Sequence, residues 1–195
     1  MTQPGLIAVL GGESTGKSVL SAALGAQLPA VVVPEFLRTW VLQHKGRVPG
    51  PIEQAQVMAA HRESEVSAGA LAARTGLSWV VSDSGPLMTA VYSIQYYDDA
   101  SLLPQALEWT AGSEQVLWCQ DDFPWQPDPQ RDGSPARAQS QRILAAIFAE
   151  HPELPVLELR GSLDERIETV AVTLGERGEL TGPAPIPLTC TDEPR

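Results

Sequence analysis

The chain has 195 residues, 43% hydrophobic and 19% charged, which is enough for one α/β domain with a substantial core and too apolar for general disorder. Its formal net charge of −11 argues against binding to a nucleic-acid backbone, which needs clustered Lys and Arg. Two cysteines without metal-ligand spacing, no apolar run near the ~18 residues that span a membrane, and no signal-like N-terminus predict a cytoplasmic protein with no membrane-bound part.

The first predicted elements are a strand over residues 6–10 and a helix over 18–28, with the octet GGESTGKS between them. The octet matches the phosphate-binding pattern G-x-x-x-x-G-K-[ST]. Its glycines let backbone N–H groups surround phosphate oxygens, and the helix directs its partly positive N-terminus at the same anion. The strand and helix around the octet disfavour a chance match, so we predict that a nucleoside triphosphate binds here. The residues predicted to hold it are Gly11, Gly12, Glu13, Ser14, Thr15, Gly16, Lys17 and Ser18.

Two residues of the octet are expected to do chemistry of their own. Lys17, one of only two lysines in the chain, is predicted to contact the β- and γ-phosphates. The Ser18 hydroxyl is predicted to coordinate Mg²⁺.

A second predicted strand, over residues 30–33, is followed by the segment PEFLR at the start of a predicted helix over 36–45. The Glu35 carboxylate would accept the proton of an attacking hydroxyl or bind a sugar hydroxyl. Arg38 would pair with Glu35 or with the transferred phosphoryl group. The alternative is an ordinary helix N-terminus with a surface arginine, which stabilises the helix modestly.

A helix predicted over 51–75 precedes a third apolar strand over 79–82, which runs into Asp83. A buried strand that ends in Asp is the Walker B pattern, in which the carboxylate holds Mg²⁺ directly or through water. We therefore predict Asp83 and Ser18 as the metal ligands. Whether Glu35 or Asp83 is the general base stays open.

The next predicted helical stretch, 85–110, carries three tyrosines at helical spacing: Tyr92, Tyr96 and Tyr97. They would line an acceptor pocket or pack in the core, and core packing is slightly favoured. The three histidines of the chain stand apart without a metal-ligand pattern, so each is expected to be a surface or structural residue.

A fourth predicted strand, 115–119, leads into a segment rich in Asp, Pro, Gly and Trp. This composition is typical of a long loop, and we predict a lid at about 120–137. Two of its residues, Arg131 and Arg137, would neutralise the charge of the transferred group and exclude water. The alternative is a solvated acidic loop with incidental arginines.

The last predicted elements are a helix over 138–150, a strand over 155–159 and a helix over 163–176. Gly161 lies in the turn after the strand, where backbone groups would face an adenine ring. This alternation predicts an α/β fold, an open and mostly parallel five-stranded sheet flanked by helices, with its ligand at the carboxyl ends of the strands. We expect one domain over 1–180 and a disordered Pro-rich tail over 181–195.

Five segments resemble, in the same order, the nicotinamide-riboside kinase domain of NadR-type bacterial proteins. They are GGESTGKS, VPEFLR, SDSGPLMTAVYS, DDFPWQPDPQRDG and RGSLDERI, from about residue 5 to about residue 176. The resemblance implies a P-loop kinase that moves the γ-phosphoryl group of ATP to the ribose 5′-hydroxyl of nicotinamide riboside, giving nicotinamide mononucleotide for NAD salvage. It also implies that residues 11–18 hold ATP and Mg²⁺, that Asp83 helps hold the metal, that Glu35 is the base or a ribose ligand, and that Arg131 and Arg137 are lid arginines.

Full-length members of that family also carry a nucleotidyltransferase domain with an H-x-G-H signature, and some carry a helix-turn-helix module. The chain contains neither, so those activities are not implied. Two alternatives stay open: a kinase for another nucleoside or vitamin-like alcohol, and a nucleotide-binding regulatory ATPase without an acceptor. The predicted arginine-bearing lid favours a kinase. The sequence leaves the oligomeric state and the preference between ATP and GTP open.

Overall fold

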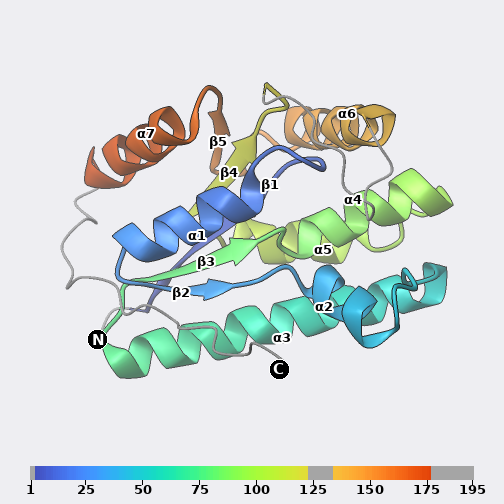
Figure 1. Ribbon diagram of the computed structural model, residues 1–195, viewed down its shortest axis with the longest axis horizontal. Helices are drawn as coiled ribbons and strands as arrows, with labels where there is room; N and C mark the ends of the chain where they lie inside the picture. Colours follow the sequence, from blue (N-terminus) through green and yellow to red (C-terminus); the bar gives the residue numbers. More distant parts are fainter. Residues whose placement is uncertain (1–2, 123–133, 177–195) are drawn as a thin grey trace, which may run out of the picture.

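The computed structural model describes residues 3–122 and 134–176. Within these residues, parallel strands alternate with helices along the chain (Figure 1). The elements are β1 (Gly5–Leu10), α1 (Lys17–Gln27), β2 (Ala30–Val33), α2 (Phe36–Gln43), α3 (Pro51–Thr75), β3 (Trp79–Asp83), α4 (Pro86–Tyr97), α5 (Leu103–Ala111), β4 (Gln115–Cys119), α6 (Ser134–Glu150), β5 (Val156–Leu159) and α7 (Leu163–Glu176).

The five strands form one sheet in the order β2-β3-β1-β4-β5, and every neighbouring pair is parallel. In the central strand, Val9 pairs with Asp83 on one side and with Leu117 on the other. The predicted open α/β fold is confirmed. Unbroken apolar runs such as Leu6–Leu10 suit this sheet because helices cover both of its faces.

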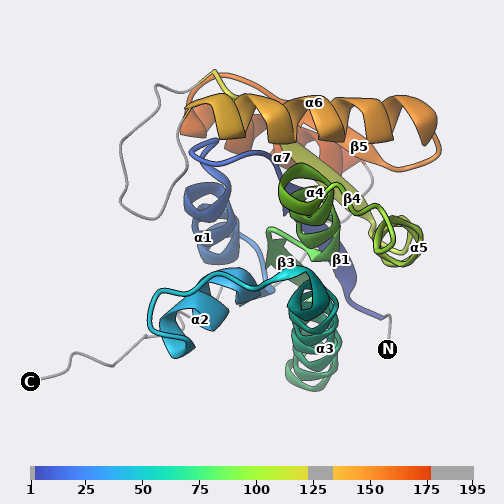
Figure 2. The ribbon, with the colours of Figure 1, turned by 90° about the vertical axis from the view of Figure 1, so that its right-hand side faces the viewer.

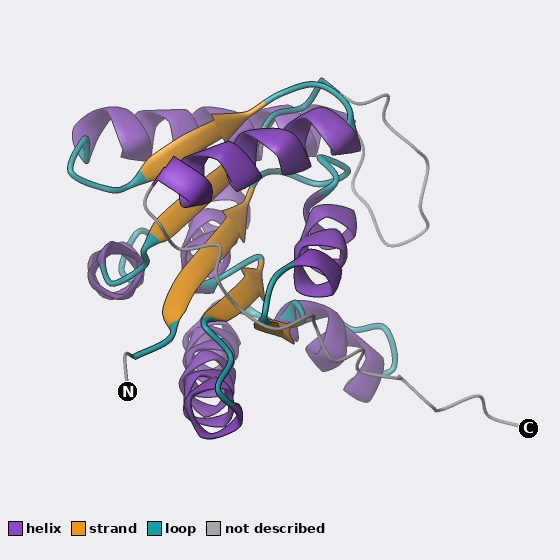
Figure 3. Ribbon diagram, turned by 90° about the vertical axis from the view of Figure 1, so that its left-hand side faces the viewer, coloured by secondary structure: helices purple, strands orange, loops and turns teal. Residues whose placement is uncertain are grey.

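Helices lie on both faces of the sheet (Figure 3). On each face, the helices and the strands share one hydrophobic cluster. Leucines of α1 and α7, including Leu24 and Leu174, pack on one face against Val9. The other face carries α4, α5, α6 and part of α3, where Leu87 and Leu144 pack against Leu10 (Figure 2). α3 also covers β2 and β3 at the edge of the sheet.

The predicted bounds of two helical stretches, 85–110 and 138–150, differ most from those in the structure. The predicted stretch 85–110 is two helices, α4 and α5, because Asp98 ends α4 in the left-handed conformation and Pro104 begins α5 in its first turn. α6 begins at Ser134 rather than at residue 138. Pro135 in its first turn suits this start, since proline fixes a helical φ and its missing N–H is not needed there.

The sequence-predicted functional residues follow neighbouring strands at one edge of the sheet. The phosphate-binding loop follows β1, Glu35 follows β2, and Asp83 ends β3. Because the strands are parallel, their carboxyl ends meet at this edge, which is where open α/β sheets bind ligands. In the part of the chain that the structure describes, none of the helices has the length and apolarity to traverse a bilayer.

Candidate active site

The loop between β1 and α1 has the backbone shape of an anion-binding loop. Ser14 and Gly16 both have a left-handed φ, 55° and 83°, which turns successive N–H groups toward one side. Gly11 has a φ of 148°, and a Cβ on it would lie 2.7 Å from the Cys119 carbonyl oxygen. Position 11 therefore requires glycine because of both its backbone conformation and its close approach to β4.

Positive charge gathers inside this loop. The Lys17 ammonium donates a hydrogen bond to the Gly12 carbonyl at 2.8 Å, and the Thr15 hydroxyl donates to the same oxygen at 2.9 Å. α1 begins at Lys17 with Gly16 as its N-cap, no acidic residue in its first turn and, among the described residues, no side chain that caps it. The uncapped helix N-terminus and Lys17 together fit the phosphates of a nucleotide.

Gln141 on α6 anchors the loop from the opposite side. Its Oε1 accepts hydrogen bonds from the Gly12 N–H at 3.2 Å and from Trp118 Nε1 at 3.1 Å. Its Nε2 donates to the Cys119 carbonyl at 2.9 Å. One amide thus joins the loop to the end of β4, a role that sequence analysis missed because a glutamine in a helix has no distinctive spacing.

Arg166 on α7 makes a second anchor and is only 1% exposed. Its guanidinium donates to the Thr15 carbonyl at 2.8 Å, to the Gln120 carbonyl at 3.1 Å and to the Gly161 carbonyl at 3.1 Å. It also forms an ion pair with Asp122, whose other carboxylate oxygen accepts from the Gly161 N–H at 2.5 Å. Arg166 therefore joins the phosphate-binding loop to the ends of β4 and β5 and brings Gly161 into the same network.

Replacing Arg166 with methionine is expected to lower the free energy of unfolding by about 3 kcal/mol, because two buried carbonyls and the half-buried Gly161 carbonyl lose their donor and Asp122 loses its ion-pair partner. Urea denaturation of both proteins measures the difference. The matched control is Arg160→Met, since Arg160 is exposed and pairs with Glu158 at the surface. The control is expected to cost less than about 1 kcal/mol. Equal losses in the two variants would contradict the anchoring role.

The two predicted metal ligands lie together at the edge of the loop. Burial raises the pKa of the Asp83 carboxyl, while a hydrogen bond with Ser18 and the charge of Lys17 oppose the rise. No group of three or more His, Cys, Asp or Glu is arranged to hold a metal in the described ranges. Mg²⁺ commonly takes one or two protein oxygens and completes its octahedron with phosphates and water. Ser18 and Asp83 fit such a site beside a bound triphosphate.

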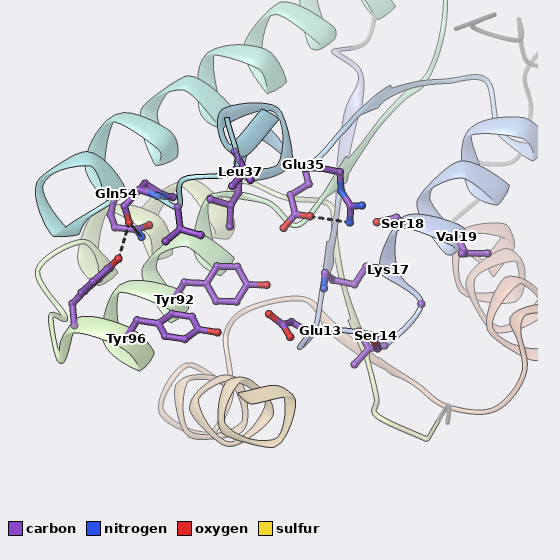
Figure 4. A pocket seen from close by; sticks show the side chains of 18 residues that line it. Glu13, Ser14, Lys17, Ser18, Val19, Glu35, Leu37, Gln54, Tyr92 and Tyr96 are labelled. Carbon is purple, nitrogen blue, oxygen red and sulfur yellow. Dashed lines mark hydrogen bonds and ion pairs between the residues drawn. The ribbon is translucent and has the colours of Figure 1, made fainter. Parts of the chain in front are cut away.

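A cavity of about 600 Å³ extends from this loop toward α2, α3 and α4. Glu35, Lys17 and Tyr92 point into it from three different elements (Figure 4). Arg38 forms an ion pair with Glu35 at 3.6 Å. This is one of the two partners that the sequence predicts for Arg38, the other being the transferred phosphoryl group. The cavity is lined by Glu13, Ser14, Thr15, Gly16, Lys17, Ser18, Val19, Glu35, Leu37, Arg38, Val41, Gly46, Val48, Pro49, Gln54, Tyr92, Tyr96 and Tyr97.

The three tyrosines of α4 line the cavity, and Tyr92 and Tyr96 extend toward Glu13 of the loop (Figure 4). Tyr92 both lines the cavity and packs in the core. Burial raises the pKa of Tyr92 well above its usual value, and the nearby carboxylates of Glu35 and Glu13 add to the rise. The Tyr97 hydroxyl donates to the Pro49 carbonyl at 2.6 Å and fastens α4 to the start of α3.

The predicted arginines of the lid differ in position. Arg137 lies in α6 rather than in a loop, is buried, and packs against the phosphate-binding loop, since a Cβ on Gly12 would lie 2.8 Å from its carbonyl oxygen. Arg131 lies outside the described residues, as do most of the predicted lid and the predicted tail.

Comparison with known proteins places this arrangement in a structural group. A family model described as "AAA domain" matches residues 6–166. The fold is similar to a NadR protein in complex with NR, with a TM-score of 0.74, 19% identity and coverage of 96% of this chain and 53% of that one. It is also similar to NadR in complex with NAD and AMP-PNP, with a TM-score of 0.72, 17% identity and coverage of 93% and 51%.

A third similar structure is thymidylate kinase from Candida albicans, with a TM-score of 0.66, 12% identity and coverage of 92% of this chain and 94% of that one. The chain spans about half the length of the NadR chains. No curated protein sequence matches it significantly. The resemblance to NadR-type domains that the motifs indicated is thus confirmed for the fold, which is that of P-loop kinases.

Proposed function

The chain belongs to the AAA domain family, and on that premise we propose that it is an ATP-dependent small-molecule kinase. The reaction proposed is transfer of the γ-phosphoryl group of ATP to the ribose 5′-hydroxyl of nicotinamide riboside. One observation carries the proposal: a single cavity is lined by the phosphate-binding loop, by Glu35 and, beyond them, by residues of α2 and α4 and of the segment before α3. A protein that only binds a nucleotide has no need of a carboxylate and a tyrosine-lined wall in the same cavity as the loop.

The donor side of the proposed reaction uses the loop and the end of β3. Lys17 and the N-terminus of α1 would hold the phosphates of ATP, and Ser18 and Asp83 would hold Mg²⁺. The metal would supply positive charge that neutralises the phosphate oxygens. Arg166 and Gln141 keep the loop in the binding conformation through the Thr15 carbonyl and the Gly12 N–H. In phosphoryl transfer, most of the catalysis comes from hydrogen-bond donors and positive charges that are already in position around the transferred group.

On the acceptor side we propose Glu35 as the base or hydroxyl-orienting group. The ribose 5′-oxygen would form a bond to the γ-phosphorus as the bond to the β-phosphate oxygen breaks, and ADP would leave. Glu35 would take the hydroxyl proton. Asp83 suits this task less well, because it is buried and already bonded to Ser18 on the metal side.

The charge of the cavity supports a neutral or cationic acceptor. Beyond the loop, its charged lining residues are Glu35 and Arg38, which pair with each other, and Glu13 lies within the loop itself. No arginine of the described lining is left to neutralise a phosphate on the acceptor. Nicotinamide riboside carries a positive, flat ring, and Tyr92 and Tyr96 offer aromatic faces to such a ring. The similarity to NadR in complex with NR supports the same choice.

The test is a mass-spectrometric assay of the purified chain with Mg-ATP and a pool of nucleosides that includes nicotinamide riboside. The Lys17→Ala variant is the blank. A gain of one phosphate on nicotinamide riboside alone is the expected result. Phosphorylation of a different nucleoside would support the proposed mechanism and identify another acceptor. Bound ATP with no phosphorylated product would favour a regulatory ATPase.

A further inference from the structure

A chain of buried polar side chains lies beneath the site and takes no direct part in the proposed reaction. Its members are His61 and Glu65, one turn apart on α3, and Ser82 on β3, and all three are at most 4% exposed. Polar groups are costly to bury unless each finds a hydrogen-bond partner. Here each one does, and the partners run from α2 to β3.

The hydrogen bonds fix where the protons lie. Burial lowers the pKa of His61 to about 4, so the ring is neutral near pH 7 and carries one N–H. The Phe36 N–H donates to His61 Nδ1 at 3.3 Å, which leaves the ring proton on Nε2. Nε2 then donates to Ser82 Oγ at 2.8 Å, and Ser82 Oγ donates to Glu65 Oε1 at 2.7 Å. Arg62 donates to the other oxygen of Glu65 at 2.9 Å.

Two of the hydrogen-bonded residues are next in sequence to the predicted carboxylates of the site, Glu35 and Asp83. Phe36 directly follows Glu35, and Ser82 directly precedes Asp83. The two carboxylates interact electrostatically. Burial is the largest cause of the raised pKa of Asp83, and the charge of Glu35 adds to it. The relative position of Phe36 and Ser82 thus sets that of the acceptor and metal sides of the cavity.

α2 depends on this polar connection because it has little packing of its own. All eight of its residues are described and none of them is buried. Apolar burial is the usual means by which a helix is held in place, and in α2 it is limited to half-buried side chains such as Leu37, which packs against the core. A hydrogen bond at the first residue of the helix is therefore a main determinant of where Glu35 lies.

We propose that His61 is a positioning residue: with Ser82 and Glu65 it holds the start of α2 at the end of β3 and so places Glu35 opposite the metal side of the cavity. The catalytic meaning of this inference rests on the proposed kinase function. If the polar chain served stability alone, its loss would weaken the fold without a specific effect on turnover.

The variants that test the proposal are His61→Leu, His61→Gln, Ser82→Ala and the double variant His61→Leu/Ser82→Ala. His61→Leu is expected to lower kcat about 10- to 100-fold, because displacement of a reacting group by about 1 Å costs on that order, with a KM for ATP that changes less than about threefold. His61→Gln should recover most of the kcat, since its amide supplies both an acceptor and a donor. The double variant should be no slower than His61→Leu, as expected for two members of one network.

The matched control is Thr110→Val on α5, which removes a buried hydroxyl that donates to the Ala106 carbonyl at 2.7 Å, away from the cavity. It should change kcat by less than about twofold, even if its loss of stability in urea equals that of Ser82→Ala. An unchanged kcat in both His61→Leu and Ser82→Ala would overturn the proposal. So would equal falls in kcat for Thr110→Val and Ser82→Ala.

Hydrogen exchange separates the failure of this inference from failure of the kinase function. In His61→Leu the Phe36 amide should exchange at least about tenfold faster, while the Val9 amide in β1 keeps its protection. An unchanged Phe36 amide would overturn the proposal whatever the activity. If the wild-type chain phosphorylates no acceptor but the Phe36 amide loses protection, the connection between α2 and β3 stands and its catalytic role fails with the kinase function.

Discussion

Replacing Lys17 with alanine is expected to lower kcat for phosphoryl transfer by about 10³-fold or more. Lys17 is only 8% exposed, and its ammonium lies inside the phosphate-binding loop, where its charge meets little screening by water. The negative charge that develops on the transferred group would lose its nearest protein cation. Loss of a single preordered donor costs about 10²–10³ in kcat in other enzymes, and a full charge is worth more.

The measurement is the initial rate of nicotinamide mononucleotide formation at saturating Mg-ATP. Lys45→Ala is the matched control, since Lys45 is the other lysine of the chain, is exposed, and carries the same charge. The control should keep a rate within about twofold of wild type. A near-wild-type rate for Lys17→Ala would remove the loop from the proposed mechanism.

Replacing Glu35 with glutamine is expected to lower kcat about 10²- to 10⁴-fold, the range that a positioned general base contributes. The amide has nearly the same size and still bonds a hydroxyl, but it does not take a proton. The affinity for ATP should change less than about threefold, because Glu35 lies on the acceptor side of the cavity. Single-turnover rates and a separate ATP-binding titration measure the two effects.

Glu63→Gln is the matched control for this change, since Glu63 is an exposed carboxylate on the outer face of α3. It should leave both kcat and ATP affinity unchanged. If Glu35→Gln altered ATP binding alone, Glu35 would belong to the donor side. A modest fall in kcat, of about threefold, would favour a role in binding the ribose hydroxyl over proton transfer.

Much of the fold could be predicted from the sequence because its signals are local. The strands are short apolar runs between turns, and no end of an observed strand lies more than one residue from the predicted end. The octet GGESTGKS places a loop between a strand and a helix by its own backbone requirements. Positions just after the strands were predictable as the ligand edge because a parallel sheet has one such edge.

The supporting residues of the site were not predictable in the same way. Arg166, Gln141 and His61 all stand in helices, where such residues are usually solvated, and nothing in their spacing distinguishes them. Each is buried because of its neighbours in space, which come from β1, β3, β4 or loops far along the chain. Such neighbours follow only from the way in which the helices pack on the sheet.

The lack of buried residues in α2 has a consequence for how this protein can evolve. Leu37, Val41 and Val48 form the cavity wall next to Glu35, yet none of them belongs to the fully buried core. Substitutions there change the shape of the cavity at less cost in folding free energy than substitutions in the fully buried core, and least at the exposed Val48. The nucleotide loop, by contrast, is tied to α6 and α7 by buried polar contacts. In the proposed kinase, mutation of α2 and of the loop after it would therefore change the acceptor more readily than the nucleotide donor.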